Sequence, residues 1–254
     1  MSEREDRWKQ IQALYSNYFT LIRVNAIQHA EGWKGCFLSH KKCIQLAKHS
    51  KMDQIIVMED DCVPFLNISD FVKRLNIICE QLNKLKAWHI FLGGVYGNSI
   101  PPATRSSKLI QIKNQKYQQI HFGFCTHLII YNSSCYEFFL QHPVNRPIDH
   151  VWHGKLTALI PLPFLANQNN GFSNIQHKFV SNVSQKINNY NNTLMKKTLM
   201  LKENNNNGMN DRQIVSSNSQ QKFIIKPMHQ FDLKKKEQKA KRIDIMKWKL
   251  KYIK

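Results

Sequence analysis

The stretch QIIVMEDDCVPF, residues 54–65, decides how the rest of this sequence is interpreted. Its apolar run, residues 55–58, is typical of a buried strand. Three acids follow at once, Glu59, Asp60 and Asp61. Three carboxylates at the end of one strand repel one another unless a positive charge lies among them. The stretch therefore predicts a cation-binding site at the carboxyl end of a strand.

Hard cations suit such a site. Mg²⁺ and Mn²⁺ prefer carboxylate oxygens, and their sites often share the metal with the phosphate groups of a substrate. Side chains alternate along an extended chain, so Glu59 and Asp61 share one face while Asp60 points away. We therefore expect Glu59 and Asp61 to bind Mn²⁺ or Mg²⁺. A solvated acidic loop is the alternative, and the apolar run directly before the acids argues against it.

Helical and strand-like patterns alternate along the first 175 residues. Apolar residues at helical spacing, with capping residues before them, predict helices at residues 2–18, 32–51, 69–85 and 133–142. Short apolar runs predict strands at residues 19–24, 55–58, 87–95 and 125–132. This alternation predicts an α/β fold, a sheet with helices on both faces.

The chain of 254 residues divides by composition into a compact domain, residues 1–175, and a low-complexity tail, residues 176–254. The tail is rich in Asn and Lys and holds 18 basic and 5 acidic residues, a large share of the net charge of +20. Such a segment buries too little apolar surface to offset its ordering entropy. We expect a disordered or partly helical basic tail. The alternative is a patch that binds an acidic surface, a membrane or nucleic acid.

The N-terminal segment and the length of the apolar runs indicate the compartment of the protein and the redox state of its cysteines. The chain opens with a polar, charged segment instead of a signal peptide, and no apolar run reaches the length of about 20 residues that spans a membrane. We therefore expect a cytoplasmic protein, in a viral or host compartment, whose six cysteines are reduced thiols. The abundance of Asn, Lys and Ile indicates an A/T-rich genome, such as that of a giant virus or a protist.

Two neighbouring motifs carry a resemblance to a known family. The stretch GCFLSHKKCIQLAK, residues 35–48, precedes the strand that ends in Glu-Asp-Asp, and this order resembles glycosyltransferase family 25. The family includes bacterial lipooligosaccharide galactosyltransferases and collagen hydroxylysine galactosyltransferases. Further stretches that look like family segments are HIFLGGVYGN (89–98), FGFCTHLIIYNSSCYEFFL (122–140), PIDHVW (147–152) and PLPFLANQNNGFSNI (161–175).

The resemblance implies a GT-A-like fold, a nucleotide-sugar donor and a metal held by the acidic residues. The implied reaction moves a hexose, galactose or glucose, from a UDP-sugar to a hydroxyl group of a glycan, a lipid-linked glycan or a collagen-like protein. An inverting enzyme also needs a carboxylate that takes the proton of the acceptor hydroxyl. Asp149 is the candidate, because it is the one acid in a long stretch of the second half of the domain. A helix N-cap is the alternative role for Asp149.

Several polar and small residues are candidates for contact with the donor. They are Arg23, Ser39, His40, Asp60, Gly93, Gly94 and Gln168. Each also has a structural interpretation: Ser39 caps a helix with His40 packed beneath it, the two glycines form a tight turn, and Arg23 faces solvent. His150 and His153 are spaced for a zinc pair with Asp149, but without further ligands we expect surface or core histidines.

Two departures from the family pattern leave other functions open. A GT-A sheet opens with a strand before the first helix, and this chain starts at that helix, so the first strand is missing or another segment replaces it. A catalytically inactive relative that binds a glycan or a partner protein is therefore the alternative. A nucleic-acid-binding protein that uses the basic tail is a third hypothesis. Nothing in the compact region resembles a reader of RNA or DNA, so nucleic acid is not the expected partner.

Overall fold

A computed structural model describes residues 5–85, 87–95, 108–169, 171–173, 178–180 and 182–207. The chain divides into two units, Met1–Gly208 and Met209–Lys254, and the second unit lies outside the described residues. The sequence-based prediction for the end of the basic tail falls there. The description that follows concerns the first unit alone.

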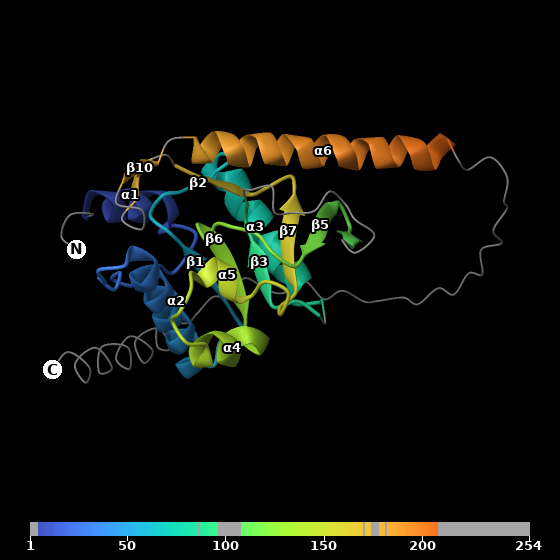
Figure 1. Ribbon diagram of the computed structural model, residues 1–254. Helices are drawn as coiled ribbons and strands as arrows, with labels where there is room; N and C mark the ends of the chain where they lie inside the picture. Colours follow the sequence, from blue (N-terminus) through green and yellow to red (C-terminus); the bar gives the residue numbers. More distant parts are fainter. Residues whose placement is uncertain are drawn as a thin grey trace, which may run out of the picture. The chain divides into compact units, whose positions relative to one another are not determined.

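A six-stranded mixed sheet forms the centre of this unit (Figure 1). Its spatial order is β1 (Gln54–Met58), β6 (Leu128–Asn132), β3 (Ile90–Leu92), β7 (Ala158–Leu162), β5 (Gln115–Ile120) and β4 (Leu109–Ile112). The pairing of β3 with β7 is parallel, and the other pairings in this sheet are antiparallel. The strand that leads into the acids is therefore an edge strand.

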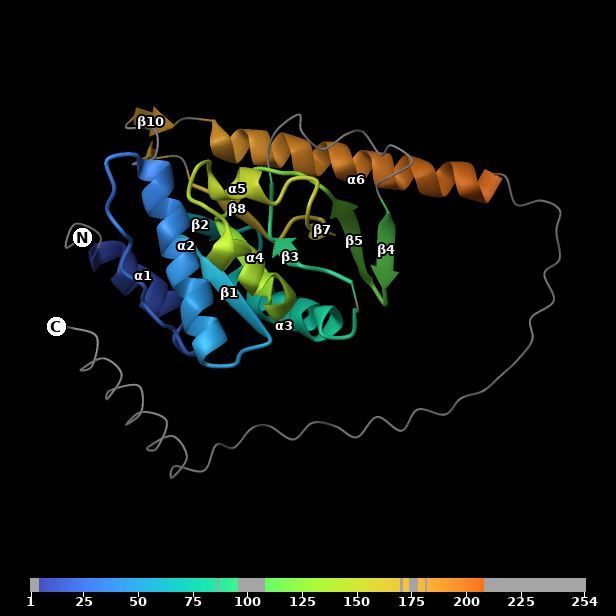
Figure 2. The ribbon, with the colours of Figure 1, turned by 60° about the horizontal axis from the view of Figure 1, so that its bottom comes forward.

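Helices cover both faces of the sheet, as the sequence predicts. Side chains alternate along β3, so Ile90 and Leu92 join the apolar core on one face while Phe91 joins the core on the other. The first core includes side chains of α2 (Gly32–His49), α4 (Tyr136–Gln141) and α6 (Val183–Asn207), and the second includes those of α1 (Glu5–Tyr15) and α3 (Ile68–Leu82). Figures 1 and 2 show α3 on the side of the sheet opposite α2 and α4.

The helix α3 begins one residue earlier than the sequence suggests. The cap is Asn67, whose side chain accepts a hydrogen bond from the backbone N–H of Asp70 at 3.0 Å. Ser69 and Asp70, whose side chains are also of a capping type, lie inside the first turn instead. An Asn side chain satisfies the free N–H groups of a first turn as well as Ser or Asp does. The residue types at positions 67, 69 and 70 therefore do not distinguish which of them is the N-cap.

The expected strand at residues 19–24 is wrong: residues 20–29 have no regular secondary structure. The strand β1 lines the same cavity as this segment, and no strand of the part of the chain that the structure describes pairs with its outer edge. The backbone N–H of Gly93 bonds to the carbonyl of Leu128 at 2.8 Å, so Leu128 directs its backbone groups toward β3. Its register partner Met58 therefore directs its own groups the opposite way, to the open edge of β1.

The first part of the predicted tail is helical, which is one of the two forms expected for it, but this helix also packs on the core. Residues 183–207 form the helix α6, the long helix at the top of Figure 1. Val183, Ile187 and Leu194 recur at helical spacing on one face and lie buried in the core with Phe164. A few apolar residues on one stripe are enough to dock a helix, even when Asn and Lys dominate its composition.

Candidate functional site

The acids lie where the carboxyl ends of several strands meet, at one end of the sheet. The strands β1, β3 and β7 run in the same direction, because β1 and β3 are both antiparallel to β6 and β3 is parallel to β7. Their carboxyl ends therefore share one edge, and the amino end of β6 lies there too. Carboxyl ends of strands are where open α/β sheets bind ligands.

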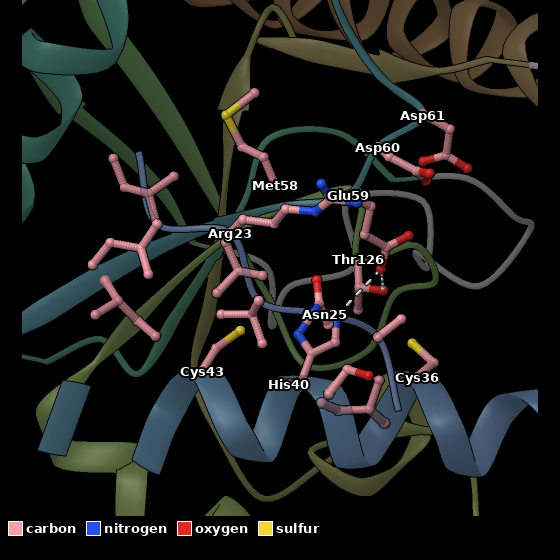
Figure 3. A pocket seen from close by; sticks show the side chains of 18 of the residues that line it. Arg23, Asn25, Cys36, His40, Cys43, Met58, Glu59, Asp60, Asp61 and Thr126 are labelled. Carbon is pink, nitrogen blue, oxygen red and sulfur yellow. Dashed lines mark hydrogen bonds and ion pairs between the residues drawn. The ribbon is translucent and has the colours of Figure 1, made fainter. Parts of the chain in front are cut away.

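A cavity of about 1730 Å³ opens beside this edge. It is bounded by β1 on one side and by the irregular segment of residues 19–30 on the other, with α1 and α2 flanking it. All three acids line it, as do Asp149 and Gln168. Figure 3 shows Glu59, Asp60 and Asp61 at the end of β1, above side chains that rise from α2. The cavity exceeds the usual ligand pocket of about 300–1,000 Å³ and so has room for a nucleotide sugar.

Glu59 is held from two sides. Its Oε1 atom lies 3.3 Å from Nε2 of His40 and accepts a hydrogen bond from the hydroxyl of Thr126 at 2.5 Å. Burial alone raises the pKa of Glu59, but the hydrogen bonds and charges of His40, Thr126 and His127 outweigh it. The pKa of Glu59 therefore lies below its ordinary value, and the residue is a carboxylate at neutral pH.

Only one of the two carboxylate oxygens of Asp61 has a hydrogen-bond partner among the described residues. A short antiparallel pairing of β2 (Cys62–Pro64) with β8 (Ala166–Gln168) brings Gln168 beside it, and the amide of Gln168 donates to Oδ2 of Asp61 at 2.8 Å. The other oxygen, Oδ1, is buried and has no hydrogen-bond partner among the described residues. Burial and the charge of Glu59 raise the pKa of Asp61 to about 7. A cation beside Oδ1 would satisfy this atom and remove the repulsion.

Asp149 lies on the same cavity, in the short helix α5 (Ile148–Val151). The helix is capped by Pro147 without a side-chain bond, so Asp149 is not the N-cap that the sequence leaves open. Burial raises the pKa of Asp149, while the nearby His150 and His153 oppose the rise. The two imidazole rings stack on each other, with their centroids 5.4 Å apart. The carboxyl group is therefore partly desolvated and close to basic side chains.

Two arginines reach the cavity from its N-terminal side. Arg7 pairs with Asp60 at 3.4 Å, and Arg23 pairs with Glu5 at 2.5 Å while its guanidinium stacks over the ring of Trp8. Arg7 and Arg23 both line the cavity, and Figure 3 shows Arg23 extended toward Glu59. Both arginines lie where an anionic ligand in the cavity would meet them.

Three of the expected donor-binding residues have internal partners or lie elsewhere. The hydroxyl of Ser39 donates to the carbonyl of Gly35 at 2.7 Å and accepts from the N–H of Ile27 at 2.8 Å, so it ties the irregular segment to α2. Gly93 and Gly94 do not line the cavity. A side chain at Gly94 would come within 2.3 Å of the carbonyl of Ala166, so close packing of backbone explains the glycine.

His40 belongs to a cluster that could hold a metal. The ligand atoms of Cys36, His40 and Glu59 lie within 4.8 Å of one another. The sequence predicts Glu59 and Asp61 as the metal ligands. The tertiary structure groups Glu59 with two residues of α2 instead. A cation site at the end of β1 is therefore supported in outline, with a donor set that includes sulfur and nitrogen.

Sequence reasoning missed other residues of the site, notably Cys36, Thr126 and Arg7. Cys36 and His40 are four residues apart in a predicted helix, so their position on one helix face could have been inferred. Thr126 and Arg7 gave no comparable signal. Thr126 contacts Glu59 and Arg7 contacts Asp60, and both pairs are far apart in the sequence.

Comparisons with known proteins leave the family open. No protein-family model matches the chain, and no curated protein matches it. Among the described residues, every helix is too short or too polar to cross a membrane. The functional argument therefore depends on the motifs and on the geometry of the cavity.

Proposed function

We propose that this chain transfers a hexose, galactose or glucose, from a UDP-sugar to a hydroxyl group of a glycan or protein acceptor. The reaction depends on Mn²⁺ or Mg²⁺ at the acids after β1. The observation that carries the proposal is the buried Oδ1 of Asp61, which has no hydrogen-bond partner among the described residues. Asp61 and Asp149 line the same cavity. The fold fits a GT-A-like enzyme, and the family resemblance supports the same reaction class.

The metal site and the cavity fit the donor. Asp61 and Glu59 offer carboxylate oxygens, the ligands that hard cations prefer. A bound cation would neutralise the charge that develops on the leaving diphosphate. Arg7 and Arg23 also line the cavity, and each is paired with an acid, Asp60 and Glu5 respectively. An anionic donor would compete with these acids for the two guanidinium groups.

Asp149 supplies the base. In an inverting transfer the acceptor oxygen forms a bond to the anomeric carbon, while the bond from that carbon to the diphosphate oxygen breaks. The electron pair of the broken bond leaves with UDP. The carboxylate of Asp149 takes the proton of the acceptor hydroxyl, and its raised pKa makes it a better base than an exposed aspartate.

Calorimetry with UDP, with and without Mn²⁺, tests the proposal. We expect the wild-type chain to bind UDP only with the metal, and Asp61→Asn to lose this binding while it stays folded by circular dichroism. Asp53→Asn is the matched control, because Asp53 is exposed and precedes the other end of β1. Wild-type UDP binding by Asp61→Asn, with unchanged dependence on Mn²⁺, would overturn the assignment of Asp61, and so would equal, metal-independent binding by all three proteins.

A second candidate is a binding protein that holds a nucleotide sugar or glycan without transferring it. The open edge of β1 favours it, because no strand among the described residues pairs with β1 on the cavity side. Incubation with UDP-galactose or UDP-glucose and simple sugar acceptors separates the two functions. Release of UDP together with a glycosylated acceptor supports the enzyme, and metal-dependent UDP binding without turnover supports the binding protein.

A further inference from the structure

Two side chains of α2 converge with Glu59 beside the cavity. Cys36 and His40 are one helical turn apart, so both project from the same face of α2. Figure 3 shows them rising from the helix toward the carboxylate of Glu59. All three ligand atoms lie within 4.8 Å of one another, although Glu59 comes from a different element.

The spacing is close to that of a tetrahedral zinc site. Ligand atoms bound at about 2.0–2.3 Å from a tetrahedral zinc lie about 3.3–3.8 Å apart. Nε2 of His40 and Oε1 of Glu59 are 3.3 Å apart, which meets this requirement without any movement. The sulfur of Cys36 lies within 4.8 Å of both atoms, so a shift of about 1 Å or less completes the geometry.

Neighbouring side chains hold His40 and Glu59 in place. The hydroxyl of Tyr131 lies 2.8 Å from Nδ1 of His40, and Thr126 donates to Glu59. Tyr131 is fully buried and His40 is 3% exposed, so the imidazole has little freedom to turn. A histidine that binds zinc through Nε2 carries its proton on Nδ1 and donates it to an oxygen, and Tyr131 provides that oxygen.

The donor set points to zinc over a hard cation. Thiolate and imidazole suit zinc, whereas magnesium and manganese favour oxygen ligands. Three protein ligands with one free position are typical of a catalytic zinc site, and a fourth protein ligand is typical of a structural one. All three residues line the cavity, so the fourth position would be reached from it.

We propose that Cys36, His40 and Glu59 bind one zinc ion, with a water molecule as the fourth ligand on the cavity side. Binding breaks the S–H bond of Cys36 and forms a Zn–S bond, and the proton passes to solvent. The inference goes beyond the proposed sugar transfer, because these residues would bind zinc whether or not the chain uses a nucleotide sugar. The two proposals share Glu59. With zinc bound to Glu59, Asp61 and the phosphate oxygens of the donor would hold the hard cation, because one carboxylate together with substrate phosphates is enough for such a site.

Titration of the metal-free chain with Co²⁺ and with Zn²⁺ tests the proposal. Cobalt bound to a thiolate gives a sulfur-to-metal charge-transfer band, so we expect this band at one equivalent per chain. Cys36→Ser should abolish the band and weaken zinc binding at least tenfold. Cys43→Ser is the matched control, because Cys43 is a half-buried thiol on the same helix outside the cluster. It should keep the band and the affinity.

Other outcomes would overturn the proposal. A folded wild-type chain that binds neither metal contradicts it, and so does a band that survives Cys36→Ser or disappears in Cys43→Ser. If Cys36→Ser does not fold, Glu59→Gln replaces it and should weaken zinc binding at least tenfold. The assay contains no nucleotide, so its failure leaves the sugar-transfer proposal standing. Likewise, a wild-type chain that shows no manganese-dependent UDP binding would contradict the sugar-transfer proposal and would not contradict the zinc site.

Discussion

At the scale of single residues, the acidic stretch separates into different environments. Glu59 is bonded to His40 and Thr126, Asp60 is paired with Arg7, and Asp61 has one satisfied and one unsatisfied oxygen. These environments move the pKa values of Glu59 and Asp61 in opposite directions. Neighbouring carboxyl groups whose pKa values are pushed apart have different roles at the same pH.

Asp61→Asn should stabilise the metal-free chain at alkaline pH. The folded state holds the proton of Asp61 up to about pH 7, whereas the unfolded state loses it near the ordinary pKa of 3.8. The wild type therefore loses stability as the pH rises from about 4 to 7, and the loss is complete above 7. We expect the variant to gain on the order of 2 kcal/mol at pH 8 and nothing below pH 4. Urea unfolding at both pH values, in the presence of a chelator, measures the difference.

Asp149→Asn should separate binding from chemistry. The amide keeps the shape of the side chain but cannot take a proton, so sugar transfer should fall by about 10²–10⁴-fold. Manganese-dependent UDP binding should change less than about threefold. Product formation and calorimetry on the same preparation measure both quantities. A variant that transfers sugar at the wild-type rate would exclude Asp149 as the base.

At the scale of elements, the edge strand β1 determines the character of the site. Its inner edge bonds to β6, and its outer edge faces the cavity and the irregular segment of residues 19–30. Side chains of the strand are only partly buried, and Ile56 is 38% exposed. Within the described ranges, the acids therefore follow a strand that is hydrogen-bonded to a neighbouring strand on one side only.

Hydrogen exchange should show this asymmetry along β1. The amides of Ile55 and Val57 face β6, whereas those of Ile56 and Met58 face the open edge. We expect the outward amides to exchange at least about tenfold faster than the inward ones. Exchange followed residue by residue by NMR gives the comparison. Uniform protection along the strand would show that its outer edge is paired in solution.

At the scale of the whole unit, the sheet and its two cores depend on a segment that looks unstructured by composition. The helix α6 contributes Val183, Ile187 and Leu194 to the core on one face of the sheet. Asn191 of the same helix accepts a hydrogen bond from the backbone N–H of Phe164 at 2.9 Å. The folded unit therefore extends past residue 175 and includes this helix.

Ile187→Ala should destabilise the entire unit. Ile187 is fully buried, and removal of such a side chain leaves a cavity that costs about 2–4 kcal/mol. Gln185→Ala, at an exposed position of the same helix, should change stability by less than about 0.5 kcal/mol. Chemical denaturation of both variants measures the two effects. Equal stability of Ile187→Ala and the wild type would mean that α6 does not pack on the core in solution.

Sequence patterns predicted the features that depend on residues close together in the chain. The apolar run before the acids predicted β1, and helical spacing predicted α1, α2 and α3 to within a few residues. Polar and apolar segments in alternation predicted the α/β class, and the acids marked the part of the chain that lines the cavity. Each of these signals lies within about one element, where local propensity and periodicity operate.

Tertiary structure alone decided which distant residues meet. It joined Cys36 and His40 of α2 to Glu59 and brought Gln168 to Asp61. It also packed Gly93 against the side chain of Leu128 and Gly94 against the backbone of Ala166, away from the cavity. It also left residues 19–24 without strand partners and docked α6 on the core. The physical reason is the same throughout: strand register, helix docking and side-chain contacts are settled by packing between segments far apart in the chain, which no local pattern records.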